Sequence, residues 1–145
     1  MIIRQAAQHD RSALHDLLTQ LGYPPAGDRF ILQKIEIYSA DGYHLLVCEL
    51  EGKTVGFISL HWFDMFHSVQ KMGRITALCV SDHVRDQGIG GMLLKEAEKF
   101  LTLKDCSKVE VTTNFKRTRT HEFYLKNGYS EDSRRFIKQL STKGH

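Results

Sequence analysis

Three glycines near the middle of the chain, Gly88, Gly90 and Gly91, follow a β-rich run and open an amphipathic helical pattern. The first turn of a helix has unpaired backbone N–H groups and a partial positive charge, which together bind anions such as phosphate. Glycine leaves room for the anion because it has no side chain. Arg85 precedes the turn and can add a charge-assisted hydrogen bond. The spacing therefore indicates a phosphate-binding turn, although a turn that only joins a strand to a helix has the same composition.

Two common nucleotide-binding motifs do not fit this turn. A dinucleotide-binding fingerprint needs a third glycine where Leu93 stands, and a P-loop needs a Gly-Lys-Ser/Thr run that the sequence lacks. The glycines alone therefore do not identify the ligand.

Hydrophobic periodicity places the turn within an α/β chain. Leu14, Leu17, Leu18 and Leu21 follow helical spacing after Asp10, which can cap that helix. We expect strands over residues 2–6, 43–50, 54–62, 74–81, 109–113 and 129–140, and further helices over 28–39, 88–103 and 117–127. A tight hairpin is expected at 51–53. The sequence thus predicts one mixed α/β domain over residues 1–145.

Composition excludes several classes of protein. A net charge of +3 is too small to indicate nucleic-acid binding, and a late cluster of basic residues is either a solvated face or an anion-binding surface. No apolar run approaches the ~20 residues that span a membrane, and the N-terminus lacks the apolar core of a signal peptide. The three cysteines form no Cys-x-x-Cys pair, which favours a reducing, cytoplasmic location.

Two motifs in order resemble the GNAT acetyltransferases. Arg85-x-x-Gly88-x-Gly90, between a strand and a helix, resembles the acyl-CoA-binding motif of that family. Downstream, Asn114 ends a strand, and the segment 121–129 resembles the family's Phe-Tyr-x-x-x-Gly-Phe segment. The resemblance implies a central mixed, mostly antiparallel, splayed sheet flanked by helices. Within the family, segments 61–67, 112–117 and 136–140 are similar to the aminoalkylphosphonate N-acetyltransferases.

The resemblance implies that acetyl-CoA is the cosubstrate. Backbone groups of the strand before the turn would bind its pantetheine arm, and N–H groups of the turn would bind its pyrophosphate. The implied binding residues are Leu78, Cys79, Val80, Arg85, Asp86, Gln87, Gly88, Ile89, Gly90, Gly91, Asn114, Arg117 and Tyr124. No metal ion is expected.

The resemblance also implies catalytic roles. Tyr124 matches the general acid that protonates the departing thiolate, although an aromatic residue at helical spacing is more often part of a core. Arg74 and Ala77 stand where the related aminophosphonate enzymes have carboxylates, so the usual base is missing. His61 and His67 are the expected replacements, since histidine suits a base at neutral pH. Asp64, and Glu49 acting through water, are alternative bases, and the alternative interpretation of His61 is a hydrogen-bonded core residue. Reading residues 61, 64 and 67 as a metal site finds no support in known zinc spacings.

The predicted function is acetyl transfer to a primary amine of a small molecule by direct attack on the thioester. A peptide or protein N-acetyltransferase and a non-catalytic acyl-CoA-binding module remain alternatives. The expected partners are the amine substrate and, through exposed strand edges, a second copy in a homodimer. Neither nucleic acid nor membrane is expected.

Overall fold

The computed structural model describes residues 1–113 and 118–141. The chain forms two compact units, Met1–Thr112 and Thr113–His145, which are treated separately below. The first unit holds the sheet and three α-helices, and the described part of the second holds one α-helix.

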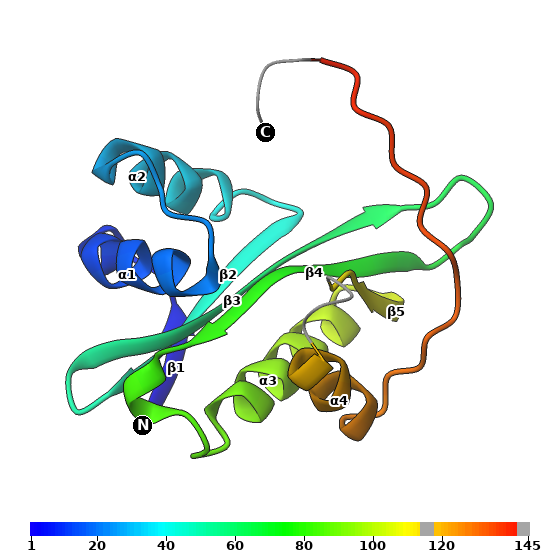
Figure 1. Ribbon diagram of the computed structural model, residues 1–145. Coiled ribbons are helices and arrows are strands. Elements are labelled where there is room, and N and C mark those ends of the chain that lie inside the picture. Colours follow the sequence, from blue (N-terminus) through cyan, green and yellow to red (C-terminus); the bar gives the residue numbers. More distant parts are fainter. Residues whose placement is uncertain (114–117, 142–145) are drawn as a thin grey trace. The chain divides into compact units, whose positions relative to one another are not determined.

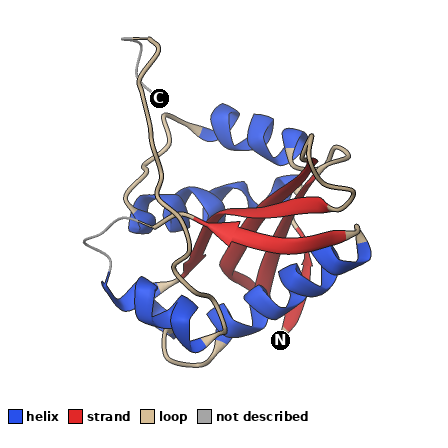
Figure 2. Cartoon of the chain, turned by 90° about the vertical axis from the view of Figure 1, so that its right-hand side faces the viewer, coloured by secondary structure: helices blue, strands red, loops and turns tan. Residues whose placement is uncertain are grey.

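A single twisted sheet organises the first unit (Figure 2). Its strands are β1 (Ile2–Gln5), β2 (Tyr43–Leu50), β3 (Lys53–Asp64), β4 (Lys71–Val80) and β5 (Cys106–Val111), and they lie in chain order. The first four strands pair antiparallel, whereas β5 pairs parallel to β4. The mixed, mostly antiparallel sheet that the sequence predicted is therefore confirmed.

Helices cover both faces of this sheet (Figure 1). On one face lie α1 (Arg11–Leu21) and α2 (Asp28–Ile37), and their buried leucines and isoleucines share a core with Leu45, Val47 and Phe57 of the sheet. On the other face lies α3 (Ile89–Leu103). A Cβ built on Gly73 of β4 would lie 2.7 Å from Leu101 of α3, so the close approach of helix and strand requires glycine there.

The connections follow from local backbone chemistry. The turn between β2 and β3 uses Glu51 and Gly52, both with positive φ, which is the geometry of a tight hairpin. Short 3₁₀ turns η1 (Gln8–Asp10) and η2 (Asp82–Val84) precede α1 and the turn into α3. The helix predicted after Asp10 does begin at Arg11, but the Asp10 side chain makes no capping bond to it.

The second unit contains α4 (Thr118–Lys126), close to the predicted helix over 117–127. The strand predicted over 129–140 is wrong, because residues 129–141 form neither helix nor strand. Phe136 and Leu140 are 91% and 92% exposed. The prediction rested on Phe136 and Ile137, but apolar residues form a stable strand only beside a hydrogen-bonded neighbour, and the described part of the second unit supplies none.

Candidate functional site

The turn from β4 into α3 has the conformation that an anion-binding site needs. Gly88 is the N-cap of α3, with φ of 76°, and no side chain caps the helix. The first intrahelical bond there runs from the Met92 N–H to the Gly88 carbonyl at 3.1 Å, so the N–H groups before Met92 remain available. A Cβ built on Gly88 or Gly91 would meet no heavy atom within 4 Å. The start of α3 is thus open, and it fits a pyrophosphate.

The residues just before the helix are exposed and partly engaged with one another. Arg85 Nη2 lies 2.7 Å from Asp82 Oδ1, and Arg85 Nε donates to the Val80 carbonyl at 3.3 Å. Asp86 has a positive φ of 70°, and both Asp86 and Gln87 are exposed. An exposed ion pair is worth at most about 1 kcal/mol. Arg85 can therefore leave Asp82 at little cost and turn toward a phosphate.

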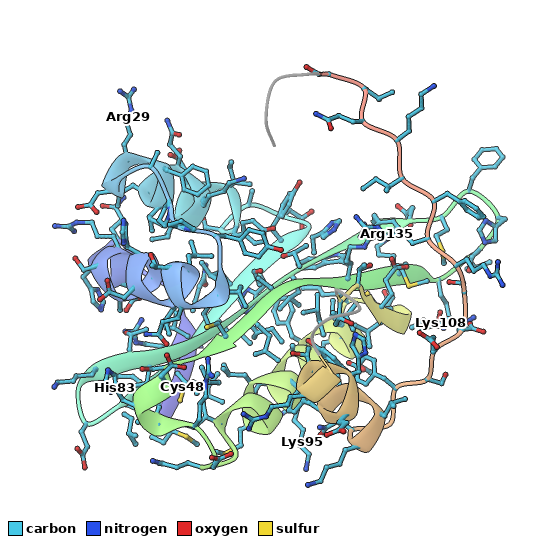
Figure 3. The ribbon with its side chains drawn as sticks, in the orientation of Figure 1. Arg29, Cys48, His83, Lys95, Lys108 and Arg135 are labelled. Atoms are coloured by element: carbon cyan, nitrogen blue, oxygen red, sulfur yellow. The ribbon has the colours of Figure 1, made fainter. Side chains whose placement is uncertain are left out.

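Contacts with α1 and β3 hold the start of this turn in place. The Asp82 N–H donates to Gln20 Oε1 of α1 at 2.9 Å, and the Ser81 N–H donates to the Val55 carbonyl of β3 at 2.7 Å. The Ser81 hydroxyl accepts from the His83 N–H at 3.3 Å, and this caps η2. His83 marks the segment in Figure 3. The approach to α3 is thus fixed by the first unit alone.

The pairing between strands β4 and β5 ends halfway along β4. Their pairing runs from Lys71 only to Ile75, which faces Val111 at the end of β5. One residue later β4 bulges, since Ser59 of β3 pairs with Ala77 while the next residue of β3 pairs with Ile75, leaving Thr76 unpaired. A bulge bends its strand and interrupts the ladder. The bulge thus lies directly beyond the last described pair between β4 and β5.

Beyond the bulge, successive residues of β4 direct their backbone N–H and C=O groups to opposite sides of the strand. The N–H of Ser81 donates to β3, so the backbone groups of Leu78 and Val80 point away from β3. Among the described residues, the β5 ladder does not reach them. Cys79 has a different role, because its side chain is buried and its Sγ lies 3.4 Å from the Leu17 carbonyl. Leu78 and Val80 are therefore placed to bind a ligand through the backbone.

A chain of hydroxyl groups lies at the bulge, and no local pattern predicts it. Tyr38, which follows α2, places its hydroxyl 3.1 Å from Thr76 Oγ1, and Ser59 Oγ lies 2.7 Å from the same atom. Thr76 is exposed, whereas Ser59 is 8% exposed. Because these groups are far apart in sequence, only the bulge and the packing of α2 bring them together.

Next to this chain, four side chains form a row across the sheet. Tyr43 pairs with His61, His61 with Arg74, and Arg74 with Glu110, so all four project from one face. The His61 ring stacks on Tyr43 and Phe63, with centroids 5.7 and 5.3 Å away. Burial and the positive charge of Arg74 lower the pKa of His61 below its ordinary 6.5, partly opposed by Glu110. His61 is therefore kept neutral at pH 7.

Glu110 is a residue that the sequence analysis missed. Arg74 Nε donates to Glu110 Oε2 at 2.9 Å, and Arg74 Nη2 donates to the same oxygen. Their side chains are 45% and 39% exposed. The relevant signal was an acidic residue in the predicted strand 109–113, but its meaning depends on the register of a parallel pair. No local pattern encodes that register.

The other predicted base residues lie away from the row. His67 is exposed in the turn after β3, and Asp64 at the end of β3 is paired with Lys71 at 2.9 Å. Asp64 is three residues beyond His61, or roughly 10 Å along a strand. Glu49 is bonded to Arg4 at 3.1 Å. Residues 1–113 and 118–141 contain no group of three side chains suited to a metal ion.

Tyr124 lies on α4, in the second unit. Its side chain is 6% exposed, and burial raises its pKa to about 12. The rings of Phe123 and Tyr129 each lie with their centroids 5.2 Å from that of Tyr124. The hydroxyl is thus fully protonated at neutral pH. Asn114 and Arg117, the other binding residues predicted near this unit, lie outside the described residues.

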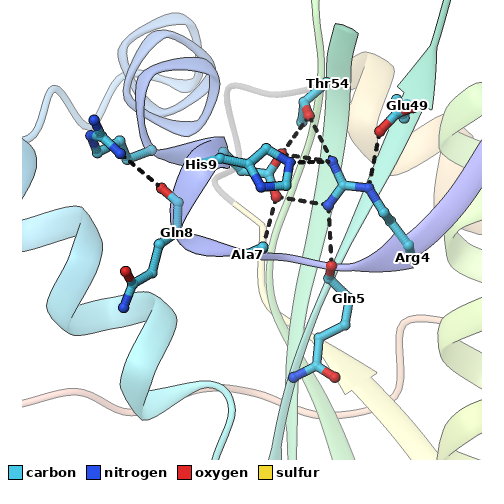
Figure 4. A network of polar contacts seen from close by, with 9 residues as sticks. Arg4, Gln5, Ala7, Gln8, His9, Glu49 and Thr54 are labelled. Atoms are coloured by element: carbon cyan, nitrogen blue, oxygen red, sulfur yellow. Dashed lines mark hydrogen bonds and ion pairs between the residues drawn. The ribbon is translucent and has the colours of Figure 1, made fainter. Parts of the chain in front are cut away.

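A second cluster of charges joins β1, η1 and the β2–β3 hairpin (Figure 4). Arg4 contacts both carboxylate oxygens of Asp10, at 2.8 and 2.9 Å, and Thr54 and the Ala7 N–H bond the same carboxylate. Asp10 is 1% exposed. Burial opposes ionisation of Asp10, but the bonds from Arg4, Thr54 and Ala7 prevail and lower its pKa to about 2. The cluster is fully satisfied internally, so it has the character of a structural network.

Comparison with known proteins places this geometry in context. Residues 11–129 match the model of the acetyltransferase (GNAT) family. The chain is 31% identical over 143 residues to an aminoalkylphosphonate N-acetyltransferase of Salmonella typhimurium, which covers 95% of this chain and 90% of that protein.

Solved structures show the same fold. An aminoglycoside N-acetyltransferase in complex with CoA superposes with a TM-score of 0.84 at 20% identity, covering 95% of this chain and 93% of that chain. A glucosamine-6-phosphate N-acetyltransferase from Arabidopsis thaliana superposes with a TM-score of 0.82 at 23% identity, covering 97% and 98%.

Proposed function

Because the chain belongs to the GNAT family of acetyltransferases, we propose that it transfers the acetyl group of acetyl-CoA to the primary amine of a small molecule. The observation that carries the proposal is the start of α3. There a left-handed Gly88, an uncapped helix terminus and open space at Gly91 meet the needs of a pyrophosphate.

The donor site combines this turn with the free edge of β4. The N–H groups of Gly88, Ile89, Gly90 and Gly91 bind the pyrophosphate. Backbone groups of Leu78 add hydrogen bonds to the pantetheine arm, as does the N–H of Val80. This division suits the fold, because within residues 1–113 the pairing of β5 with β4 ends at Ile75 and no described strand pairs with that edge of β4 beyond it.

Two side chains of the protein, a base and an acid, transfer the protons of the reaction. Acetyl-CoA supplies a thioester whose carbonyl carbon is open to attack by a neutral amine. His61 accepts a proton from the ammonium form of the substrate, which leaves the neutral amine that attacks, since a neutral imidazole is a competent base. The resemblance to the family is the ground for giving Tyr124 the role of general acid. Tyr124 donates a proton to the sulfur as the C–S bond breaks, and the second proton that the nitrogen loses on amide formation restores its hydroxyl. His67 and Asp64 are set aside as bases, because each lies away from the row that contains His61.

The substrate we favour is a small amine that also carries an anionic group. The Salmonella relative is named for aminoalkylphosphonates, compounds that combine an amine with a phosphonate. A peptide N-acetyltransferase or a non-catalytic acyl-CoA-binding module would share the donor site, but no observation favours either of them.

Location and assembly are further parts of the proposal. None of the described helices is long and apolar enough to cross a membrane. Cys48 and Cys106 are free thiols, which fits a reducing compartment such as the cytoplasm. A homodimer remains a prediction, and light scattering on the purified protein tests it.

The test is thiol release from acetyl-CoA by the wild-type protein with a panel of small amines and peptides. We expect turnover with at least one small amine. Turnover with peptides alone would contradict the proposal and indicate a peptide or protein N-acetyltransferase. Tight acetyl-CoA binding without any turnover would indicate a non-catalytic acyl-CoA-binding module.

The Gly91→Ala variant tests pyrophosphate binding at the donor site without disturbing the fold. The new methyl group meets no protein atom within 4 Å, and alanine favours a helix over glycine by about 1 kcal/mol. We therefore expect stability to be kept or raised, while the KM for acetyl-CoA rises about tenfold because the methyl group obstructs the phosphate. Gly27→Ala, which is equally open, is the matched control and should change neither value. An unchanged KM in Gly91→Ala would place the pyrophosphate elsewhere.

A further inference from the structure

The row of side chains across the sheet ends in a pair of opposite charges at a distinctive place. Arg74 and Glu110 are the last pair but one between β4 and β5, and beyond Ile75 and Val111 the two strands no longer pair. Thr76, the bulged residue, comes two residues after Arg74. The pair therefore lies next to the edge of β4 that the proposed function assigns to the acyl donor.

The bonding of this pair is incomplete. The hydrogen bonds from Arg74 Nε and Nη2 both end on Glu110 Oε2. Within the part of the chain that the structure describes, Glu110 Oε1 has no recorded donor, and Arg74 Nη1 has no recorded acceptor. A carboxylate can accept about four hydrogen bonds and a guanidinium can donate five. Both groups thus keep capacity for a ligand.

The exposure of the pair allows it to open. Side chains that are 45% and 39% exposed form an ion pair of little net stability, and a ligand can replace it without unfolding anything. A molecule with an ammonium group and an anionic group presents the same two charges in complementary order. Insertion of such a molecule exchanges one internal contact for two charge-assisted contacts with the ligand.

The neighbour of the pair fits the same purpose. His61 faces Arg74 across the β3–β4 ladder and is flanked by aromatic rings on both sides. An ammonium group held by Glu110 would lie on the same face and in the same row as the imidazole, which is the arrangement needed before its proton is removed. Arg74 also keeps a positive charge beside His61, which disfavours protonation of the ring.

Resting on the proposed function, we propose that Arg74 and Glu110 form the acceptor-recognition element, in which Glu110 binds the ammonium group of the amine and Arg74 binds its anionic group. The carboxylate that the sequence lacks at positions 74 and 77 is thus supplied from the neighbouring strand. An alternative structural role for the pair predicts that its loss changes stability and leaves acceptor kinetics alone.

The experiment compares two amines of equal chain length, 2-aminoethylphosphonate and propylamine, which ends in a methyl group instead of the phosphonate, in Glu110→Gln and Arg74→Met. Glu110→Gln should raise the KM of both amines about tenfold, and Arg74→Met should raise that of 2-aminoethylphosphonate about tenfold but that of propylamine less than about twofold. The KM for acetyl-CoA should stay within about twofold of wild type. Asp28→Asn, which removes an exposed arginine–aspartate pair between α1 and α2, is the matched control and should change none of these values.

Equilibrium binding gives a second readout without turnover. Calorimetric titration with 2-aminoethylphosphonate should show about tenfold weaker binding to Arg74→Met than to wild type. Arg74→Lys keeps the charge and loses the forked geometry, so it should fall between the two, and it replaces Arg74→Met if that variant is unstable.

Two results would overturn the inference. One is that Glu110→Gln and Arg74→Met leave both the KM values and the calorimetric affinity like those of Asp28→Asn. The other is a fall in kcat for both amines with no change in KM, which would assign the pair to chemistry or to folding. Absence of wild-type turnover with every amine would count against the proposed function alone, since the binding titration still decides whether Arg74 recognises the anion.

Discussion

Two arginine–carboxylate pairs in the first unit are the same kind of contact in opposite surroundings. The Arg4–Asp10 pair lies at the start of α1, where Asp10 is 1% exposed and all the bonds of its carboxylate are made within the protein. The Arg74–Glu110 pair lies next to the end of the β4–β5 pairing. Its carboxylate is 39% exposed and, among the residues that the structure describes, is bonded through one oxygen only. The Arg4–Asp10 pair is thus closed, meaning buried with its bonds made inside the protein, and the Arg74–Glu110 pair is open, meaning exposed to a ligand.

The contrast shows how one kind of contact serves two purposes. Removing one partner of a buried pair leaves a charge that neither water nor protein satisfies, so the pair fixes the local fold. An exposed pair adds little stability, so its presence at a mechanistically important place calls for another explanation. Stability measurements and acceptor kinetics should therefore rank the two pairs in opposite orders.

The largest expected difference concerns the free energy of unfolding. Asp10→Asn should lower it by about 3 kcal/mol, at the low end for a broken buried pair because Glu49 still bonds Arg4. Glu110→Gln should change it by less than about 0.5 kcal/mol. Urea unfolding of both variants beside wild type measures the two values, and a similar loss in both would erase the distinction.

Acid should reveal the same difference without a mutation. The pKa of Asp10 is lowered from 3.8 to about 2 in the folded state, so its contribution is complete above pH 4 and is lost as the pH falls toward 2. The loss should be roughly 2 kcal/mol over this window, by the linkage between pKa and stability. Unfolding free energies at several pH values measure it. Asp10→Asn should lack this loss and Glu110→Gln should retain it, whereas an unchanged slope in Asp10→Asn would assign the acid sensitivity to other carboxylates.

A smaller effect separates the hydroxyl groups attached to each region. Thr54 donates to Asp10 Oδ1 at 2.6 Å, and Thr54→Val should cost about 1–2 kcal/mol because a buried charged acceptor loses a donor. Thr76 is exposed at the bulge, so Thr76→Val should cost about 0.5 kcal/mol or less. Thermal unfolding compares the two isosteric changes directly. Equal losses would mean that the hydroxyl chain at the bulge is as structural as the buried network.

Local patterns in the sequence predicted most of the fold. Leucine spacing in α1, the hairpin at 51–53 and the glycine-rich start of α3 depend on neighbouring residues, and each lies where it was expected. The strand predicted over 129–140 was wrong because Phe136 and Ile137 are residues suited to a strand but cannot supply a pairing partner. The closed Arg4–Asp10 pair was likewise unforeseen, since Asp10 reads locally as a helix cap.

The site was predictable only in part, for the same physical reason. Gly88, Gly90 and Gly91 carry the donor-site signal in one short segment. The row of His61, Arg74 and Glu110 arises from three strands whose register the sequence does not state. Sequence analysis therefore noted a missing carboxylate at positions 74 and 77, but could not see that Glu110 on β5 lies opposite Arg74.

The most direct test of the account is one nitrogen-15 NMR titration of the protein with CoA and then with 2-aminoethylphosphonate. We expect CoA to shift the backbone amide signals of Leu78, Val80 and residues 88–91, and the amine to shift the Nε–H signal of Arg74. Shifts confined to the surroundings of Arg4 and Asp10, with the start of α3 unchanged, would contradict it.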